Sequence, residues 1–177
     1  MQAKQAEVAA ARREAPLARL RGEAEARRDL RPFHDALRAP GPSGVNVIAE
    51  IKRASPSKGV ICENLDPGRL AEAYTAGGAR AISVLTEGNF FRGSPEDLKQ
   101  ARSSSGLPVL RKDFIFCDYQ VYESAAMGAD ALLLIVRILS EAELADLIGL
   151  AASLGLADDS IALLGVSRGG QGALYAA

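Results

Sequence analysis

The chain has no tryptophan, one histidine (His34) and two cysteines (Cys62 and Cys117) among its 177 residues. The two cysteines lie far apart and lack the short spacing of metal ligands, so we expect reduced thiols rather than a disulfide or a zinc site. His34 precedes the first expected strand, and we expect a structural or solvent-facing role for it. No run of about 18 apolar residues occurs, so no transmembrane helix is expected.

An excess of charge of one sign is also lacking, because 21 Lys and Arg residues nearly balance 22 Asp and Glu residues. A balanced chain has no strong overall field to attract nucleic acid or an anionic membrane, and neither partner is expected. The first residues are rich in Ala, Arg and Glu and lack the apolar core of a secretory signal. We therefore expect a cytoplasmic protein.

What the sequence does have is a regular alternation of apolar runs and helical segments. Residues 1–31 are rich in helix-forming residues but are interrupted by Pro16 and Gly22. Each of four later apolar runs is typical of a strand, and each is followed by a helix with capping residues or a closing glycine. The expected strands cover residues 47–51, 81–85, 109–114 and 131–136.

Strands separated by a helix must run parallel, because only a crossover returns the chain to the same edge of the sheet. The repeat of roughly 25–30 residues is close to that of a (β/α)8 barrel, so the expected fold is α/β, a partial TIM barrel. A doubly wound sheet is the alternative, but such a sheet usually has a glycine-rich phosphate turn after its first strand. Residues 53–59 have the sequence RASPSKG at that place.

Polar residues follow three of the four expected strands. The corresponding strand ends of a barrel converge on one mouth, where barrel enzymes have their active sites. Glu50 and Lys52 are two residues apart, so both side chains point to the same side of a strand. Two lysines and a glutamate beside one pocket suit an acidic, phosphorylated substrate. The polar positions are Glu50, Lys52 and Ser55, then Thr86, Glu87, Asn89 and Phe91, and finally Lys112 and Asp113.

These positions also have structural interpretations, which the pattern alone leaves open. Glu50 and Lys52 fit a surface salt bridge on an edge strand, and Lys112 fits an ordinary surface lysine. Phe91 fits core packing as well as a substrate platform. Arg53 and its neighbours in the loop fit plain solvation of that loop.

Four segments resemble indole-3-glycerol phosphate synthase, in the order in which that family has them. They are VIAEIKRASPSKG at 47–59, SVLTEGNFFRGS at 83–94, PVLRKDFI at 108–115 and GADALLLIV at 128–136. The resemblance covers about residues 28–156. It implies a (β/α)8 barrel with an N-terminal segment across its mouth. It also implies closure of the indole ring of 1-(2-carboxyphenylamino)-1-deoxyribulose 5-phosphate in tryptophan biosynthesis, a carboxy-lyase reaction that loses carbon dioxide and water and needs no cofactor or metal.

The resemblance also implies a role for individual residues. Lys112 is similar to the family's general acid, which promotes ring closure at the substrate carbonyl. Lys52 is similar to the lysine that binds the anionic groups of the substrate and serves as an acid in the dehydration. Glu50 is similar to the carboxylate that positions and polarises the reacting groups. Ser55 and Phe91 resemble substrate-contacting residues, and Leu133 resembles a residue of the pocket wall.

The family's general-base glutamate and its glycine-rich phosphate loops belong to later strands, which do not follow Leu156 in this sequence. A whole barrel takes roughly 250 residues. We therefore expect the chain alone to turn over poorly or not at all. Open strand edges favour pairing with another chain, so a non-catalytic half-barrel that self-associates is the alternative.

The tail is unlike the family. Residues 160–177 fit a strand, a sharp turn and a helix, and residues 165–169 match the Gly-x-Ser-x-Gly nucleophile elbow of α/β-hydrolases around Ser167. A serine hydrolase fragment is the weakest alternative, since an acid and a histidine should follow that serine. The expected organisation is a helical extension over residues 1–44, a half barrel over 45–156 and a foreign strand–helix tail over 157–177.

Overall fold

The structure is a computed structural model that describes residues 1–38, 40–41, 44–157, 162–166 and 172–176. It divides into two compact units. The site unit comprises Leu30–Asp113 and Met127–Ala131, and the terminal unit comprises Met1–Asp29, Phe114–Ala126 and Leu132–Ala177. No helix among the described residues combines the length and the apolar character needed to cross a membrane.

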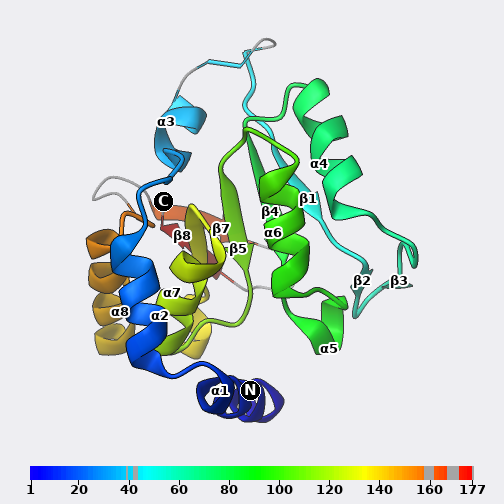
Figure 1. The fold of residues 1–177 in the computed structure, drawn as a ribbon. Coiled ribbons are helices and arrows are strands. Elements are labelled where there is room, and N and C mark those ends of the chain that lie inside the picture. The colour runs from blue at the N-terminus through cyan, green and yellow to red at the C-terminus, as the bar shows by residue number, and fades with distance from the viewer. Residues whose placement is uncertain (39, 42–43, 158–161, 167–171, 177) are drawn as a thin grey trace. The chain divides into compact units, whose positions relative to one another are not determined.

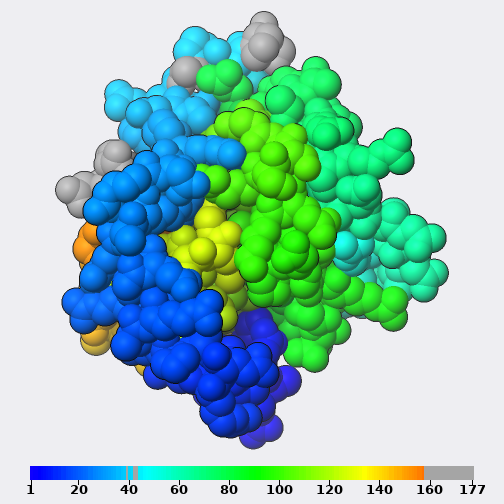
Figure 2. Space-filling view, viewed as in Figure 1, coloured from blue at the N-terminus to red at the C-terminus, as the bar shows by residue number. Residues whose placement is uncertain are grey.

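The site unit is built on three parallel strands, in the order β1–β4–β5. Apolar side chains of these strands and of two helices, α4 and α6, form its buried core. In Figure 1, α4 and α6 run beside the strands, and Figure 2 shows their side chains forming the surface on this face of the unit. The elements of the unit are α3 (Phe33–Arg38), β1 (Ile48–Ile51), β2 (Ala54–Ser55), β3 (Gly59–Val60), α4 (Pro67–Ala76), β4 (Ala81–Leu85), α5 (Gly88–Phe91), α6 (Pro95–Ser103) and β5 (Val109–Lys112).

Two helices of the site unit, α4 and α6, begin at capping residues, as the sequence predicts for the helices that follow the strands. The Asp66 side chain accepts a hydrogen bond from the main-chain N–H of Arg69 at 3.0 Å, and Pro67 occupies the first turn of α4. Ser94 caps α6 in the same way, with Pro95 following it. Gly78, two residues after the end of α4, has a φ of 84°, which glycine adopts without strain, and so turns the chain out of the helix toward β4.

The terminal unit contains helices from both ends of the described chain. One of its core clusters joins residues of α2, α7, β6 and α8. Ser140 and Glu143 form a capping box at the start of α8. The elements are α1 (Gln2–Glu14), α2 (Leu17–Ala26), α7 (Asp118–Met127, of which Met127 belongs to the site unit), β6 (Ala131–Leu134, of which Ala131 belongs to the site unit), η1 (Val136–Ile138), α8 (Glu141–Ser153), β7 (Ala162–Val166) and β8 (Gly172–Ala176).

Alternating strands and helices with parallel pairing are the architecture of a partial (β/α) barrel, as the sequence predicts. One predicted interruption is wrong, because Gly22 lies inside α2 and the helical segment is broken at Pro16 alone. Proline at that place lacks an N–H and cannot continue α1, whereas glycine only lowers helix propensity.

The predicted helix of the tail is also wrong. Residues Gly172–Ala176 form β8, which pairs antiparallel with β7 and with β6. Among the described residues of the tail, Gly165 and Val166 lie on a strand, but Gly172–Ala176 form a strand where a nucleophile elbow requires a helix. Ser167 and Gly169 lie outside the described residues.

Candidate active site

Parallel pairing brings the carboxyl ends of β1, β4 and β5 to one edge of the site unit. Glu50 lies opposite Ser83, and Leu85 lies opposite Lys112 in the next pair of strands. The polar residues that follow the three strands therefore gather at this edge, as the sequence predicts.

The side chains of Lys52, Glu50 and Lys112 meet at this edge, and we call them the lysine–glutamate cluster. Lys112 Nζ donates to Glu50 Oε2 at 2.6 Å, and Lys52 Nζ donates to the other carboxylate oxygen, Oε1. Each of the three side chains is exposed by between 28% and 30%, so the cluster is partly buried and still open to a ligand. Two ammonium groups and one carboxylate leave one net positive charge, which favours an anionic ligand.

The two neighbouring lysines stabilise the ionised form of the Glu50 carboxylate. Burial alone would raise the pKa of Glu50, but the hydrogen bonds from Lys112 and Lys52 outweigh it, and the pKa lies below the ordinary value of a glutamate. A carboxylate that stays charged keeps both ammonium groups in place.

The depressed pKa of Glu50 predicts a pH-dependent contribution to stability. A carboxyl group whose pKa is lower in the folded state stabilises the fold above its unfolded pKa, about 4.3, and this contribution is lost as the pH falls through the lower folded pKa. We expect Glu50→Gln to lower the free energy of unfolding by about 1–2 kcal/mol at neutral pH. The difference from wild type should shrink toward pH 3.

Urea unfolding at both pH values measures this difference. The exposed Glu63 of the same unit provides the matched control, Glu63→Gln. A Glu50→Gln difference that is the same at both pH values would show that the ion pairs of Glu50 do not contribute.

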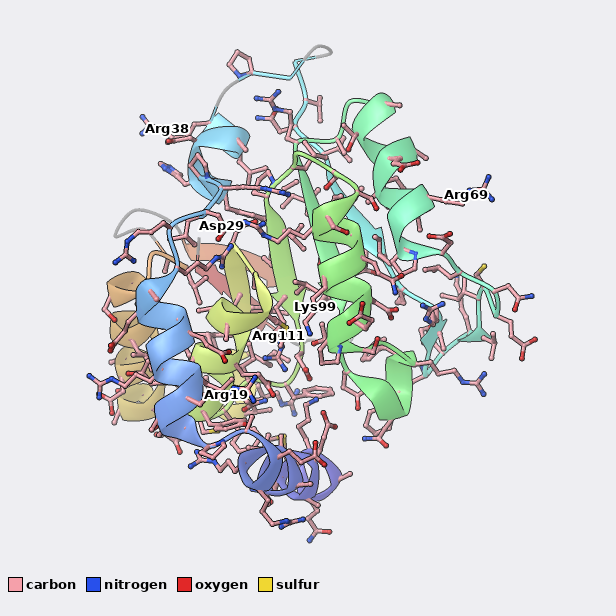
Figure 3. All side chains as sticks on the ribbon, in the orientation of Figure 1. Arg19, Asp29, Arg38, Arg69, Lys99 and Arg111 are labelled. Atoms are coloured by element: carbon pink, nitrogen blue, oxygen red, sulfur yellow. The ribbon has the colours of Figure 1, made fainter. Side chains whose placement is uncertain are left out.

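A cavity of about 560 Å³ adjoins the cluster, with Glu50 and Lys52 in its wall. Tyr74 of α4 also lines it, and its hydroxyl donates to the main-chain oxygen of Glu50 at 2.9 Å. Burial, and then the charge of Glu50, raise the pKa of Tyr74. Figure 3 shows Arg69, another lining residue, extending outward from α4. The hydrogen bond from Tyr74 therefore anchors the main chain of Glu50 to α4.

Arg53 has a structural role that the sequence did not reveal. Its guanidinium donates to both carboxylate oxygens of Asp97 on α6, at 2.6 and 3.3 Å, and to the main-chain oxygen of Leu65. These bonds fix the residue that directly follows Lys52. The structural interpretation of Arg53 as a merely solvated loop residue is therefore wrong.

The segment after β4 is held by Glu87 rather than offering that carboxylate to a ligand. Glu87 is 1% exposed, and its side chain accepts hydrogen bonds from the main-chain N–H groups of Asn89, Phe90 and Phe91. It therefore caps the one-turn helix α5. The segment ends at Gly93. Glycine is required there, because a Cβ atom would lie 2.0 Å from the main-chain oxygen of Leu85.

The other predicted contact residues are distributed over both units. Ser55 lies on β2, partly buried, and its hydroxyl accepts a hydrogen bond from the Lys58 N–H at 3.2 Å. Phe91 is partly buried on α5, which contacts β2. Leu133 is 3% exposed on β6 of the terminal unit. The structure therefore brings the elements of Ser55 and Phe91 together.

Asp113 does not join the cluster, although it stands beside Lys112 in the sequence. It is 4% exposed and accepts hydrogen bonds from Arg111 and Thr86.

Both Cys62 and Cys117 are free thiols, as predicted. Among the described residues, no group of three or more His, Cys, Asp or Glu side chains is arranged to hold a metal ion. The chemistry available at this edge is proton donation by lysine and recognition of an anion.

Comparison with known proteins identifies the family of the chain. The sequence model of the indole-3-glycerol phosphate synthase family matches residues 1–158. The protein of that name from Desulfosudis oleivorans is 57% identical over 157 residues, which are 88% of this chain and 60% of the relative. Those from Paracidovorax citrulli and Laribacter hongkongensis are 53% and 52% identical, over 87% and 85% of this chain and 60% and 58% of the relative. The chain spans about 60% of the length of these relatives, and it belongs to the indole-3-glycerol phosphate synthase family.

Proposed function

We propose that the lysine–glutamate cluster takes part in closing the indole ring of 1-(2-carboxyphenylamino)-1-deoxyribulose 5-phosphate, a carboxy-lyase reaction of tryptophan biosynthesis. One observation carries the proposal. Two lysine ammonium groups share the carboxylate of Glu50 at the carboxyl ends of parallel strands, with the Lys112 contact at 2.6 Å. The names of the relatives agree with this assignment.

Lys112 is the proposed acid of the ring closure. The ring carbon that bears the carboxylate attacks the ketone carbon, a carbon–carbon bond forms, and the ammonium proton passes to the ketone oxygen, which becomes a hydroxyl group. Carbon dioxide then leaves, and the electron pair of the broken bond restores the aromatic ring. A positioned general acid is needed because the ketone oxygen would otherwise become an alkoxide.

Lys52 and Glu50 have supporting roles in the proposal. Lys52 binds the anionic groups of the substrate and donates a proton to the departing hydroxyl group, which leaves as water. The electron pair of the ring nitrogen expels the hydroxyl group, and the ring carbon bonded to that nitrogen then loses its proton to solvent, which forms the second double bond of the indole. Glu50 holds both ammonium groups in place through its two oxygens. We assign substrate contacts to Ser55, Phe91 and Leu133, of which the first two lie on contacting elements. The free thiols and balanced charge support a cytoplasmic location.

The test is the turnover of a fusion protein. Residues 1–157 of this chain are joined to the part of the Desulfosudis oleivorans relative that follows its matched region. The fusion should consume the substrate and release equal amounts of carbon dioxide and an indole product, followed by indole fluorescence. A folded fusion with no more turnover than its variant lacking both Lys112 and Lys52 would overturn the proposal.

A second candidate function is self-association along β1. Among the described strands β1 has β4 as its one neighbour, and the preceding Val45 and Val47 are 64% and 50% exposed. An edge strand with apolar residues beside it favours pairing with another chain. We propose a dimer of this chain through that edge.

Light scattering after size-exclusion chromatography measures the mass of the chain in solution. The dimer should be present in the wild type and lost in Val47→Lys, because a charge on an edge position opposes pairing. Val60→Lys, at a position 45% exposed on β3, is the control. A wild-type chain that remains monomeric at roughly 50 μM would exclude a stable dimer.

A further inference from the structure

Three side chains at the ends of β4 and β5 bond to one another in a closed ring. Thr86 Oγ1 donates to Asp113 Oδ2 at 2.8 Å, and the guanidinium of Arg111 donates to Thr86 Oγ1 at 3.1 Å and to Asp113 Oδ2 at 3.0 Å. The residues are exposed by 2%, 4% and 2% for Thr86, Asp113 and Arg111. Arg111 is labelled in Figure 3. None of the roles described for the lysine–glutamate cluster uses this ring.

Stability is a poor explanation for such a ring. Taking two charges out of water is expensive, and apolar residues of similar size often serve as well or better. A fully bonded buried network does rigidify its surroundings and restricts them to one arrangement. The ring is therefore better explained by a need for exact geometry nearby.

The residue whose geometry it fixes is Lys112. Arg111 and Asp113 are its two chain neighbours, and the main-chain N–H of Thr86 donates to the Lys112 main-chain oxygen at 3.1 Å. Side chains alternate along a strand, so those of Arg111 and Asp113 point to one side and that of Lys112 to the other. On that other side the Lys112 ammonium reaches Glu50.

We infer that Thr86, Arg111 and Asp113 are positioning residues, which hold the main chain on both sides of Lys112 so that its ammonium group lies against Glu50. The inference deepens the proposed function, since it concerns the residue assigned as the acid. The placement of Lys112 is nevertheless measurable without any turnover.

The experiment replaces Thr86 by valine, which has the same shape but lacks the hydroxyl group that joins Arg111 to Asp113. The full chain is acetylated briefly with acetic anhydride at one fixed pH, and modification of its five lysines is quantified peptide by peptide. Loss of the hydroxyl should increase the rate at Lys112 by about threefold to tenfold. The rates at the exposed Lys58 and Lys99 should stay the same and serve as internal references.

Thr75→Val is the matched control, because the Thr75 hydroxyl donates to the Ala71 oxygen of its own helix and touches none of these groups. Thr86→Ser, which keeps the hydroxyl and loses a methyl group, should restore the wild-type rate at Lys112. Equal rates at Lys112 in wild type and Thr86→Val would overturn the inference, as would a rise at every lysine, which signals general loosening. These outcomes do not depend on whether the fusion protein turns over.

Discussion

Lys112→Ala is expected to lower the kcat of the fusion protein by about 10²–10⁴-fold, the range that a positioned general acid contributes. Alanine leaves the ketone oxygen without its proton donor as the ring carbon attacks. It also removes the 2.6 Å hydrogen bond to Glu50, which leaves that carboxylate with Lys52 alone in the cluster. KM should change much less than kcat, because the proton is transferred only in the transition state.

Steady-state kinetics of the purified fusion and its variants measures both constants. Lys99→Ala is the matched control, because Lys99, labelled in Figure 3, is 54% exposed on α6 and pairs only loosely with Glu96, at 3.9 Å. Its kcat should remain within about twofold of the parent, as expected for a surface substitution. Retention of full kcat by Lys112→Ala would remove the acid role from Lys112 and shift it to Lys52.

Asp130→Ala is expected to destabilise the chain by about 3–5 kcal/mol, the loss measured when one partner of a buried ion pair is removed. The Asp130 carboxylate is fully buried and accepts at least three hydrogen bonds within the site unit. They come from the main-chain N–H groups of Arg31 and Val109, both at 3.0 Å, and from the Arg102 guanidinium at 3.3 Å. Alanine leaves the N–H at the start of β5 and the Arg102 charge without this acceptor.

Urea unfolding followed by circular dichroism measures the change. Asp146→Ala, at an exposed position of α8, should change the free energy of unfolding by no more than about 0.5 kcal/mol. A loss below about 1 kcal/mol for Asp130→Ala would show that the three donors find other partners, such as water.

The repeating elements of the fold could be predicted because their signals are local. Capping residues such as Asp66 and Ser94 mark the helix starts, and apolar runs mark the strands. The convergence of Lys52, Glu50 and Lys112 also followed from the sequence, since parallel strands end at one edge and side chains alternate along each strand. Both rules need only the order of residues.

The remaining features depend on contacts between residues far apart in the chain. Arg53 finds Asp97 44 positions away, and Thr86 finds Asp113 27 positions away, so no short pattern distinguishes them from solvated residues. The prediction of a helix in the tail was wrong for a related reason. Residues 172–176 have no strong helical or strand pattern, and they pair with β6 and β7 in the structure.

The absence of a side chain at position 93 lets the main chain pass close to the end of β4 directly after the turn that contains Phe91. Any larger residue at Gly93 would collide with the Leu85 oxygen and force the turn around Phe91 away from the end of β4. Asn89 and Phe90, which are exposed in the same turn, carry no such restriction. Across a set of homologous sequences, positions 89 and 90 should therefore vary, whereas position 93 should remain glycine.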